Sequence, residues 1–291
     1  MKKEYTLRHP VVDGLFYPDS KAELESTIKE YLERIDRPAL FERIQEQSGI
    51  SSPEDRVPIV LIVPHAGYIF SGKVQAFSYS LLENNPIKTA IIIGPAHQKS
   101  FKGISVNLDN AYKIPSGLLD VDLAFSNQLV SYSDKISLNE EAHLREHSIE
   151  VQLPFIQKVI PGVKIVTILI GEQSWDNSEL LKSALIAVME KLPERYIVIA
   201  SSDLSHYHAH IEALELDKVL IRDVRKMDPV NFYKNIESGN SEACGFGGIL
   251  TGIMLANELG DGKSAELFYM DSGEVSGDRN KVVGYLSAAL Y

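Results

Sequence analysis

The sequence has a single cysteine, Cys244, in 291 residues, and this scarcity excludes an internal disulfide. Because disulfides are typical of extracellular compartments, nothing in the composition indicates secretion. The start of the chain, MKKEYTLRHP, also lacks the apolar segment of a signal peptide. The apolar runs are as long as strands and far shorter than the ~20 residues that cross a bilayer. We therefore expect a cytoplasmic protein.

Basic residues are also few. Lys and Arg number 29 against 40 Asp and Glu, so the net charge is 29 − 40 = −11, and no Lys/Arg run stands out. A chain this acidic lacks the positive surface that binds nucleic acid or an anionic membrane. The motifs G-x-G-x-x-G, G-x-x-x-x-G-K-[ST] and G-x-S-x-G are missing as well. Nucleotide-dependent chemistry and serine hydrolysis are therefore disfavoured.

Apolar, β-branched segments alternate with stretches of helical periodicity. The expected strands are 58–63, 89–93, 163–170, 196–200, 265–270 and 282–289, and the expected helices are 20–35, 72–83, 120–132 and 176–191. Ser20 and Glu23 have the spacing of a capping box, and 47–57 is a polar loop. Wholly apolar strands between helices indicate a sheet that is buried on both faces.

We predict an α/β fold with a central, mixed and mostly parallel sheet covered by helices on both faces. The expected domain organisation is a single domain over residues 1–291. In it, an N-terminal arm and helix (1–57) pack on the α/β core (58–291).

Three of the predicted strands end in polar clusters. His65 follows the first strand, His97 follows the second, and Asp203 and His206 follow the strand at 196–200. Ligands of open α/β sheets bind beyond the carboxyl ends of the strands. These side chains are therefore predicted to converge on one site.

His65 and His97 each lie in a turn framed by Pro and Gly, and imidazole is a frequent metal ligand. The alternative is that they only hydrogen-bond backbone carbonyls. Cys244, in EACGFGG, is expected at the first turn of a helix, where the dipole favours a thiolate. The alternative is a buried thiol that acts as a small apolar residue.

Asp203 and His206 share the segment SSDLSH. This pair suits an orienting carboxylate and an acid–base imidazole, or one further metal ligand. The alternative is an Asp203 N-cap with a surface histidine. His208 and His210, the next two histidines, are expected to face solvent from a loop.

Residues 143–147 read HLREH, which matches the H-x-x-E-H zinc-protease pattern. No third ligand is identifiable, however. We instead expect a helix that continues to a bend at Pro154 and directs His147, together with Glu146, into the strand-end site.

Several sequence motifs follow one another along the chain. They are RHPVVDGLFYP (8–18), VPHAGY (63–68) with Ser71-Gly72, GPAH (94–97), EHSIEVQLP (146–154), SDLSHY (202–207), Cys244-Gly245, DSGEVSGD (271–278) and VGY (283–285). Together they resemble the Memo family over nearly the whole chain.

This resemblance implies a fold like that of the class III extradiol dioxygenases, which hold Fe(II) with two histidines and a carboxylate. It implies His65, His97 and Cys244 as metal ligands, and His147, Asp203 and His206 as further pocket residues with catalytic roles. It also implies iron or copper and a redox role. Animal members are linked to cell motility and to phosphotyrosine peptides of receptor kinases, and microbial members to AMMECR-type and radical-SAM proteins.

These expectations lead to two functions. The first is a metal-dependent redox enzyme with Fe(II) or copper, in which Tyr68 is placed to hydrogen-bond a bound anion. A thiolate in place of a carboxylate makes the site softer, so zinc also fits, and makes the ligand itself oxidisable. The second is a non-catalytic binding module whose pocket holds a small molecule, a peptide (a phosphotyrosine peptide among them) or a partner protein.

Overall fold

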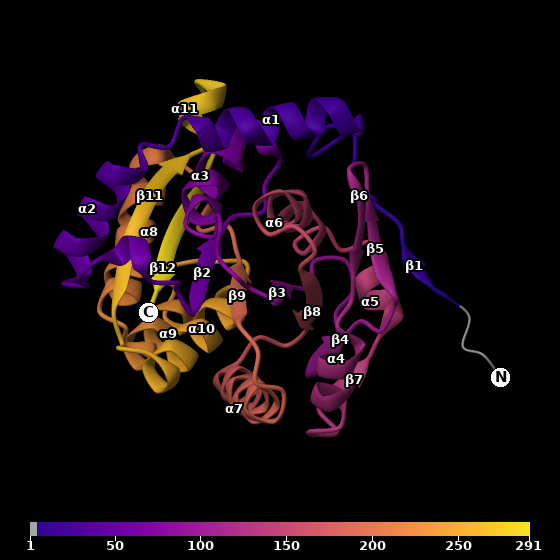
Figure 1. The fold of residues 1–291 in the computed structure, drawn as a ribbon. Helices are drawn as coiled ribbons and strands as arrows, with labels where there is room; N and C mark the ends of the chain where they lie inside the picture. Colours follow the sequence, from indigo (N-terminus) through magenta and orange to yellow (C-terminus); the bar gives the residue numbers. More distant parts are fainter. Residues whose placement is uncertain (1–4) are drawn as a thin grey trace.

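Four parallel strands form the centre of the main sheet in the computed structural model, which describes residues 5–291 (Figure 1). Their order across the sheet is β2 (Val60–Val63), β9 (Tyr196–Ser201), β3 (Thr89–Pro95) and β8 (Lys164–Ile170). Their continuous apolar sequences match burial on both faces. The first four residues, which belong to the segment tested for a signal peptide, lie outside the described residues.

Antiparallel pairings flank this centre. On one side β12 (Val282–Leu290) runs antiparallel to β2, to β11 (Ser264–Asp271) and to β10 (His206–His208). On the other, β4 (Ile104–Val106) is antiparallel to β8 and parallel to β7 (Ile136–Leu138). A smaller sheet contains β1 (Leu7–Arg8), β5 (Ala111–Ile114) and β6 (Gly117–Asp120). The predicted α/β fold with a mixed sheet is confirmed.

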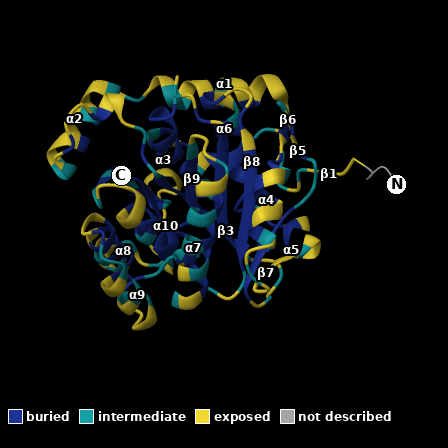
Figure 2. Ribbon diagram, turned by 60° about the horizontal axis from the view of Figure 1, so that its bottom comes forward, coloured by how far each residue is buried: buried dark blue, intermediate teal, exposed yellow. Residues whose placement is uncertain are grey.

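Helices cover both faces of the main sheet. Because successive side chains of a strand point to opposite faces, each strand contributes to two cores. Leu61 and Val63 of β2 lie in one core, whereas Val60 and Ile62 lie in the other. The first core is shared with α1 (Lys21–Glu33), α2 (Arg37–Ser48), α3 (Tyr68–Ser80) and α6 (Leu153–Val159). The second is shared with α4 (Leu123–Val130), α7 (Trp175–Lys191), α8 (His210–Arg225), α9 (Pro229–Glu237) and α10 (Phe246–Leu259). Figure 2 shows buried strands between helices whose outer faces are exposed.

Some local structure differs from the sequence-based expectations. Helix α2 was not expected; its N-cap Asp36 accepts a hydrogen bond from Ala39 N (3.1 Å), and Gly49 ends it with a φ of 68°. Helix α1 begins after Ser20 as predicted, but the Ser20 side chain makes no capping hydrogen bond. The remaining short helices are α5 (Glu140–Leu144), α11 (Gly273–Ser276), η1 (Pro53–Asp55) and η2 (Glu150–Gln152).

The expected helix through 143–154 is wrong. Helix α5 ends at Leu144, and α6 begins only at Leu153, with Pro154 in its first turn. Proline is tolerated at that position because the N–H that it lacks has no partner in the first turn anyway. His143 and His147 are therefore not on one helix.

Within residues 5–291, no helix combines the length and the apolar character that a membrane span requires.

Candidate metal centre

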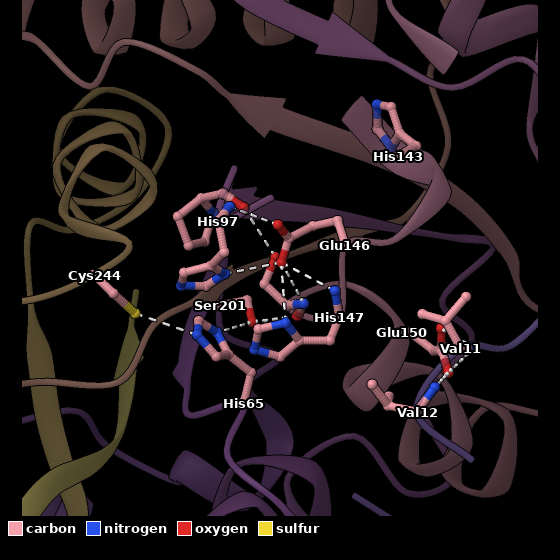
Figure 3. Close-up of polar contacts among 12 residues, drawn as sticks. Val11, Val12, His65, His97, His143, Glu146, His147, Glu150, Ser201 and Cys244 are labelled. Atoms are coloured by element: carbon pink, nitrogen blue, oxygen red, sulfur yellow. Dashed lines mark hydrogen bonds and ion pairs between the residues drawn. The ribbon is translucent and has the colours of Figure 1, made fainter. Parts of the chain in front are cut away.

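The strand order explains how distant residues meet. Because β2, β9 and β3 are parallel neighbours, the segments after them leave the sheet at the same edge. His65 and His97 each come two residues after their strand. Ligand atoms of His65, His97 and Cys244 all lie within 4.8 Å of one another (Figure 3). The structure thus brings together the three predicted metal ligands.

Cys244 reaches this edge from the segment that precedes α10. Its Sγ lies 3.2 Å from His65 Nε2 and 3.3 Å from the backbone nitrogen of Asp203, which donates to it. Gly245 permits this approach, since a Cβ there would lie 2.4 Å from the carbonyl oxygen of Ser201. The glycine beside the cysteine is therefore a packing requirement of the site.

A serine determines the tautomer of His65. Ser201 Oγ donates to the carbonyl of Ser148 (2.6 Å) and accepts from Gln152 Nε2 (2.9 Å). Because its single proton is committed, its contact with His65 Nδ1 (2.9 Å) requires that the imidazole donates. His65 Nε2 then carries the lone pair, and this nitrogen faces Cys244.

A carboxylate has the same role for His97. Glu146 accepts hydrogen bonds from His97 Nδ1 (2.9 Å) and from the backbone nitrogens of His97 (2.6 Å), His147 (3.0 Å) and Ser148 (2.9 Å). Burial by itself opposes ionisation of Glu146, but the hydrogen bonds from His97 and Ser148 hold its pKa at about 2. The ionised carboxylate thus leaves Nε2 of His97 as the nitrogen that can bind a cation.

Burial also determines the protonation of the other candidate ligands. It lowers the pKa of His65 well below 6.5, and the neighbouring His97 and His147 lower it further, so His65 is a neutral imidazole. It raises the pKa of the Cys244 thiol, and the Asp203 carboxylate adds to this effect. The predicted stabilisation of a thiolate by a helix start is therefore wrong: a thiolate here requires a compensating cation.

The residues predicted to be catalytic lie beside these ligands. Asp203 Oδ1 accepts from the backbone nitrogen of His65 (2.8 Å), so it positions a backbone segment rather than an imidazole, and burial raises its pKa to about 6. The His206 Nδ1–H donates to the carbonyl of Leu204 (2.7 Å). The ring of His147 stacks on that of His97, with centroids 4.8 Å apart.

A cavity of about 510 Å³ opens over these side chains. His65, His97, His147, Asp203 and His206 are its polar lining, and Leu15, Phe16, Ile69, Phe70, Tyr207, Val283 and Tyr285 are its main apolar lining. Leu15, Ile69 and Tyr207 are 80%, 70% and 72% exposed, so the mouth is apolar. Tyr207 also has a φ of 64°, a rare conformation for an aromatic residue that is often found at functional sites.

Other predicted participants lie elsewhere. The hydroxyl of Tyr68 is buried and donates to the carbonyl of Val151 (3.0 Å). The expectation that it hydrogen-bonds a bound anion is therefore wrong. His143 points away from the cluster in Figure 3, with its Nε2 3.1 Å from Ser105 Oγ, which removes the zinc-protease hypothesis.

His208 and His210 are half-buried rather than solvent-facing. His208 contacts Glu242 (3.0 Å) and His210 contacts Asp271 (2.5 Å). Sequence reasoning also missed Ser201 and Gln152. The only signal for Ser201 was its place at the end of a predicted strand, directly before the segment that carries Asp203.

The donor set fits a transition metal. Two imidazole nitrogens and one sulfur form a borderline-to-soft set that suits copper, iron or zinc rather than Mg²⁺ or Ca²⁺. A structural zinc site would need a fourth protein ligand. A second group, His97, Glu146 and His147, also has the required proximity, but Glu146 already accepts four hydrogen bonds.

The chain is similar to known proteins over nearly its whole length. Residues 8–289 match the family model described as Memo-like protein. The chain is 38% identical over 282 residues to a MEMO1 family protein of Methanobrevibacter smithii, which covers 97% of this chain and 98% of the relative. It is 36% identical over 285 residues to one of Sulfolobus acidocaldarius (97% and 98%) and 32% identical over 280 residues to one of Nitrosopumilus maritimus (96% and 98%).

Proposed function

Because this chain belongs to the Memo-like protein family and its pocket gathers two imidazoles and a thiol, we propose that it binds a redox metal, iron or copper, through His65, His97 and Cys244. The metal serves oxidation chemistry on a small substrate in the cavity above. The observation that carries this proposal is the orientation of the imidazoles: both Nδ1 atoms are held by hydrogen bonds to other side chains, which leaves the Nε2 atoms as the metal-binding nitrogens, and that of His65 already faces Cys244 Sγ. Family membership also agrees with the predicted class III extradiol dioxygenase-like fold.

The protein's residues would have distinct roles in such chemistry. A bound iron or copper would supply one-electron transfer. Glu146 and Ser201 fix the two imidazoles, and Asp203 fixes the backbone of His65. His147 and His206 line the cavity and can hold or release a proton beside a substrate.

The test is metal content by mass spectrometry on protein purified without air. Wild type should contain about one iron or copper per chain, and Cys244→Ser should lose it. Zinc in place of iron or copper would contradict the redox function but not the site. Full occupancy of the Cys244→Ser variant would contradict the assignment of Cys244 as a ligand.

The exposed side chains at the mouth favour a second candidate function, a binding module without turnover. Leu15, Ile69 and Tyr207 present apolar surface to a ligand, and among residues 5–291 no Lys or Arg lines the cavity. Arg8 is buried in an ion pair with Glu150. This pocket thus fits a peptide with an apolar side chain better than a phosphotyrosine peptide. Saturable peptide binding without oxygen consumption would support it.

AMMECR-type and radical-SAM partners stay a prediction. Co-purification of the chain with either protein from cell extract, compared between wild type and Tyr207→Ser, would test whether the cavity mouth takes part in such a contact.

A further inference from the structure

A second cavity, of about 550 Å³, lies away from the candidate metal centre. It is bounded by the C-terminal half of α8, the end of α2 and the edge strand β11, which lie close together in Figure 1. None of its lining residues belongs to the metal pocket. This volume is within the range of small-molecule sites, ~300–1,000 Å³.

Positive charge gathers in this cavity although the chain is acidic. Lys218, Arg222, Arg225 and Lys226 are four of its nine lining residues, whereas Lys and Arg together make up 29 of the 291 residues of the chain. Among the residues that the structure describes, the only acidic one in the lining is Glu266, so the charge of this lining is 4 − 1 = +3. The α8 dipole accounts for cations in its last turn, Arg222 and Arg225, but not for Lys218.

Internal ion pairs use only part of this charge. Lys218 lies 3.5 Å from Glu215, and both side chains are solvent-exposed, so this pair is weak. Arg222 directs Nε and Nη2 to Asp223, which leaves Nη1. Arg225 and Lys226 form no ion pair with any residue that the structure describes. At least two cations are thus available to a ligand.

The rest of the lining is apolar or aromatic. Ile221 and Leu214 line the cavity together with the ring of Tyr269, whose hydroxyl donates to Asp217 (2.7 Å). That hydroxyl is therefore committed to the protein and offers a ligand no proton. A ligand that matches this lining combines anionic groups with a flat apolar body.

We propose that this cavity, the α8 anion pocket, binds a phosphorylated small molecule with an aromatic body, of the nucleoside diphosphate class. Arg225 and Lys226 contact the phosphates, and Tyr269 and Ile221 contact the ring system. Because the chain has a net charge of −11 and salt screens charges beyond ~8 Å, binding depends on these local cations rather than on long-range attraction. The site requires no metal and does not rest on the function proposed above.

The test is calorimetric titration of the full chain at physiological salt with ADP, inorganic pyrophosphate and adenosine as probes. We expect ADP to bind with a Kd below about 1 mM, pyrophosphate to bind more weakly and adenosine not to bind. Arg225→Gln with Lys226→Gln should weaken ADP binding by at least about tenfold. Lys21→Gln with Lys29→Gln, on exposed positions of α1, removes the same charge and should change it less than about twofold.

Each other result has a definite meaning. Equal loss in both double variants, or no ADP binding at millimolar concentration, would overturn the proposal. Adenosine binding as tightly as ADP would overturn the role of the cations, and pyrophosphate binding as tightly as ADP would overturn the role of the aromatic lining. Thermal melting of each variant, expected to match wild type because all four side chains are exposed, excludes misfolding as the cause.

Discussion

Ser201 Oγ accepts a hydrogen bond from the Nδ1–H of His65 (2.9 Å), and its own hydroxyl donates a hydrogen bond to the carbonyl of Ser148. A neutral hydroxyl therefore orients one candidate metal ligand, whereas an ionised carboxylate, Glu146, orients the other. The two imidazoles are therefore held by acceptors of different charge. The asymmetry gives these two positioning residues separate, testable effects.

Ser201→Ala should weaken metal binding by about 10–100-fold, the usual effect of losing a residue that orients a ligand. It leaves the Nδ1–H of His65 without its acceptor and removes one of the two acceptors of the Gln152 amide, so the free energy of unfolding should fall by about 1–3 kcal/mol. Chelator competition and denaturant titration measure the two effects. Ser126→Ala is the matched control, because Ser126 is also fully buried but its hydroxyl has no partner among the described residues. Unchanged metal affinity in Ser201→Ala would show that Ser201 does not position His65 for metal binding.

Glu146→Gln should destabilise the fold as well as the metal site. Its carboxylate accepts four hydrogen bonds, and an amide would oppose some of these donors with an NH₂ group. We expect the free energy of unfolding to fall by about 2–3 kcal/mol. Glu141→Gln removes a carboxylate from an exposed pair with Lys99 and should cost less than about 1 kcal/mol. Equal stabilities of the two variants in urea would contradict this account.

Gly245→Ala tests the close approach of Cys244. The added Cβ would lie 2.4 Å from the carbonyl oxygen of Ser201, and the backbone must shift to relieve the clash. We expect the free energy of unfolding to fall by about 1–3 kcal/mol, with a clear loss of metal affinity. Gly67→Ala, at the cavity mouth, places its Cβ 3.5 Å from the nearest atom and should leave metal affinity unchanged. Wild-type metal affinity in Gly245→Ala would contradict the packing argument.

The sequence predicted the meeting of His65 and His97 because strand identity and topology are enough for it. Apolar, β-branched runs define β2 and β3, and parallel neighbours direct the segments after them to one edge of the sheet. No side-chain orientation is needed for that argument. The position of Cys244 was harder to predict, since it depends on how α10 packs beneath those strands.

The features that the sequence did not predict depend on tertiary burial and on helix ends. Whether His143 or His147 faces the site depends on the end of α5 at Leu144, which no proline or glycine marks. The raised pKa of the Cys244 thiol results from desolvation and from the nearby Asp203 carboxylate, and both depend on tertiary packing. Helix α2 was not predicted because few of its positions are apolar, although Asp36, Pro38 and Gly49 are residue types that mark helix ends.

His143 should make stability depend on pH in the acid range. Burial lowers its pKa from 6.5 to about 3, so between these values the unfolded chain holds a proton that the folded chain does not. The free energy of unfolding should therefore fall as the pH drops from 6.5 towards 3, by up to about 1.4 kcal/mol per pH unit from this group. His143→Gln should reduce that slope by about one proton in urea titrations across the range. His9→Gln, which removes a histidine from an exposed position, is the matched control. The same slope in both variants would mean that His143 is protonated in the folded state.

Cys244→Asp should change which metal the site prefers. A carboxylate oxygen is a hard ligand, so the variant should lose the Cu(I) affinity that a thiolate provides while it retains Fe(II) through His65, His97 and the new carboxylate. Cys244→Ser is the matched control, since its neutral hydroxyl should support neither metal. Anaerobic competition titrations with Cu(I) and Fe(II) chelators measure both affinities. If Cys244→Asp binds Cu(I) as tightly as wild type, Sγ is not a ligand, and the cluster of His97, Glu146 and His147 becomes the alternative site.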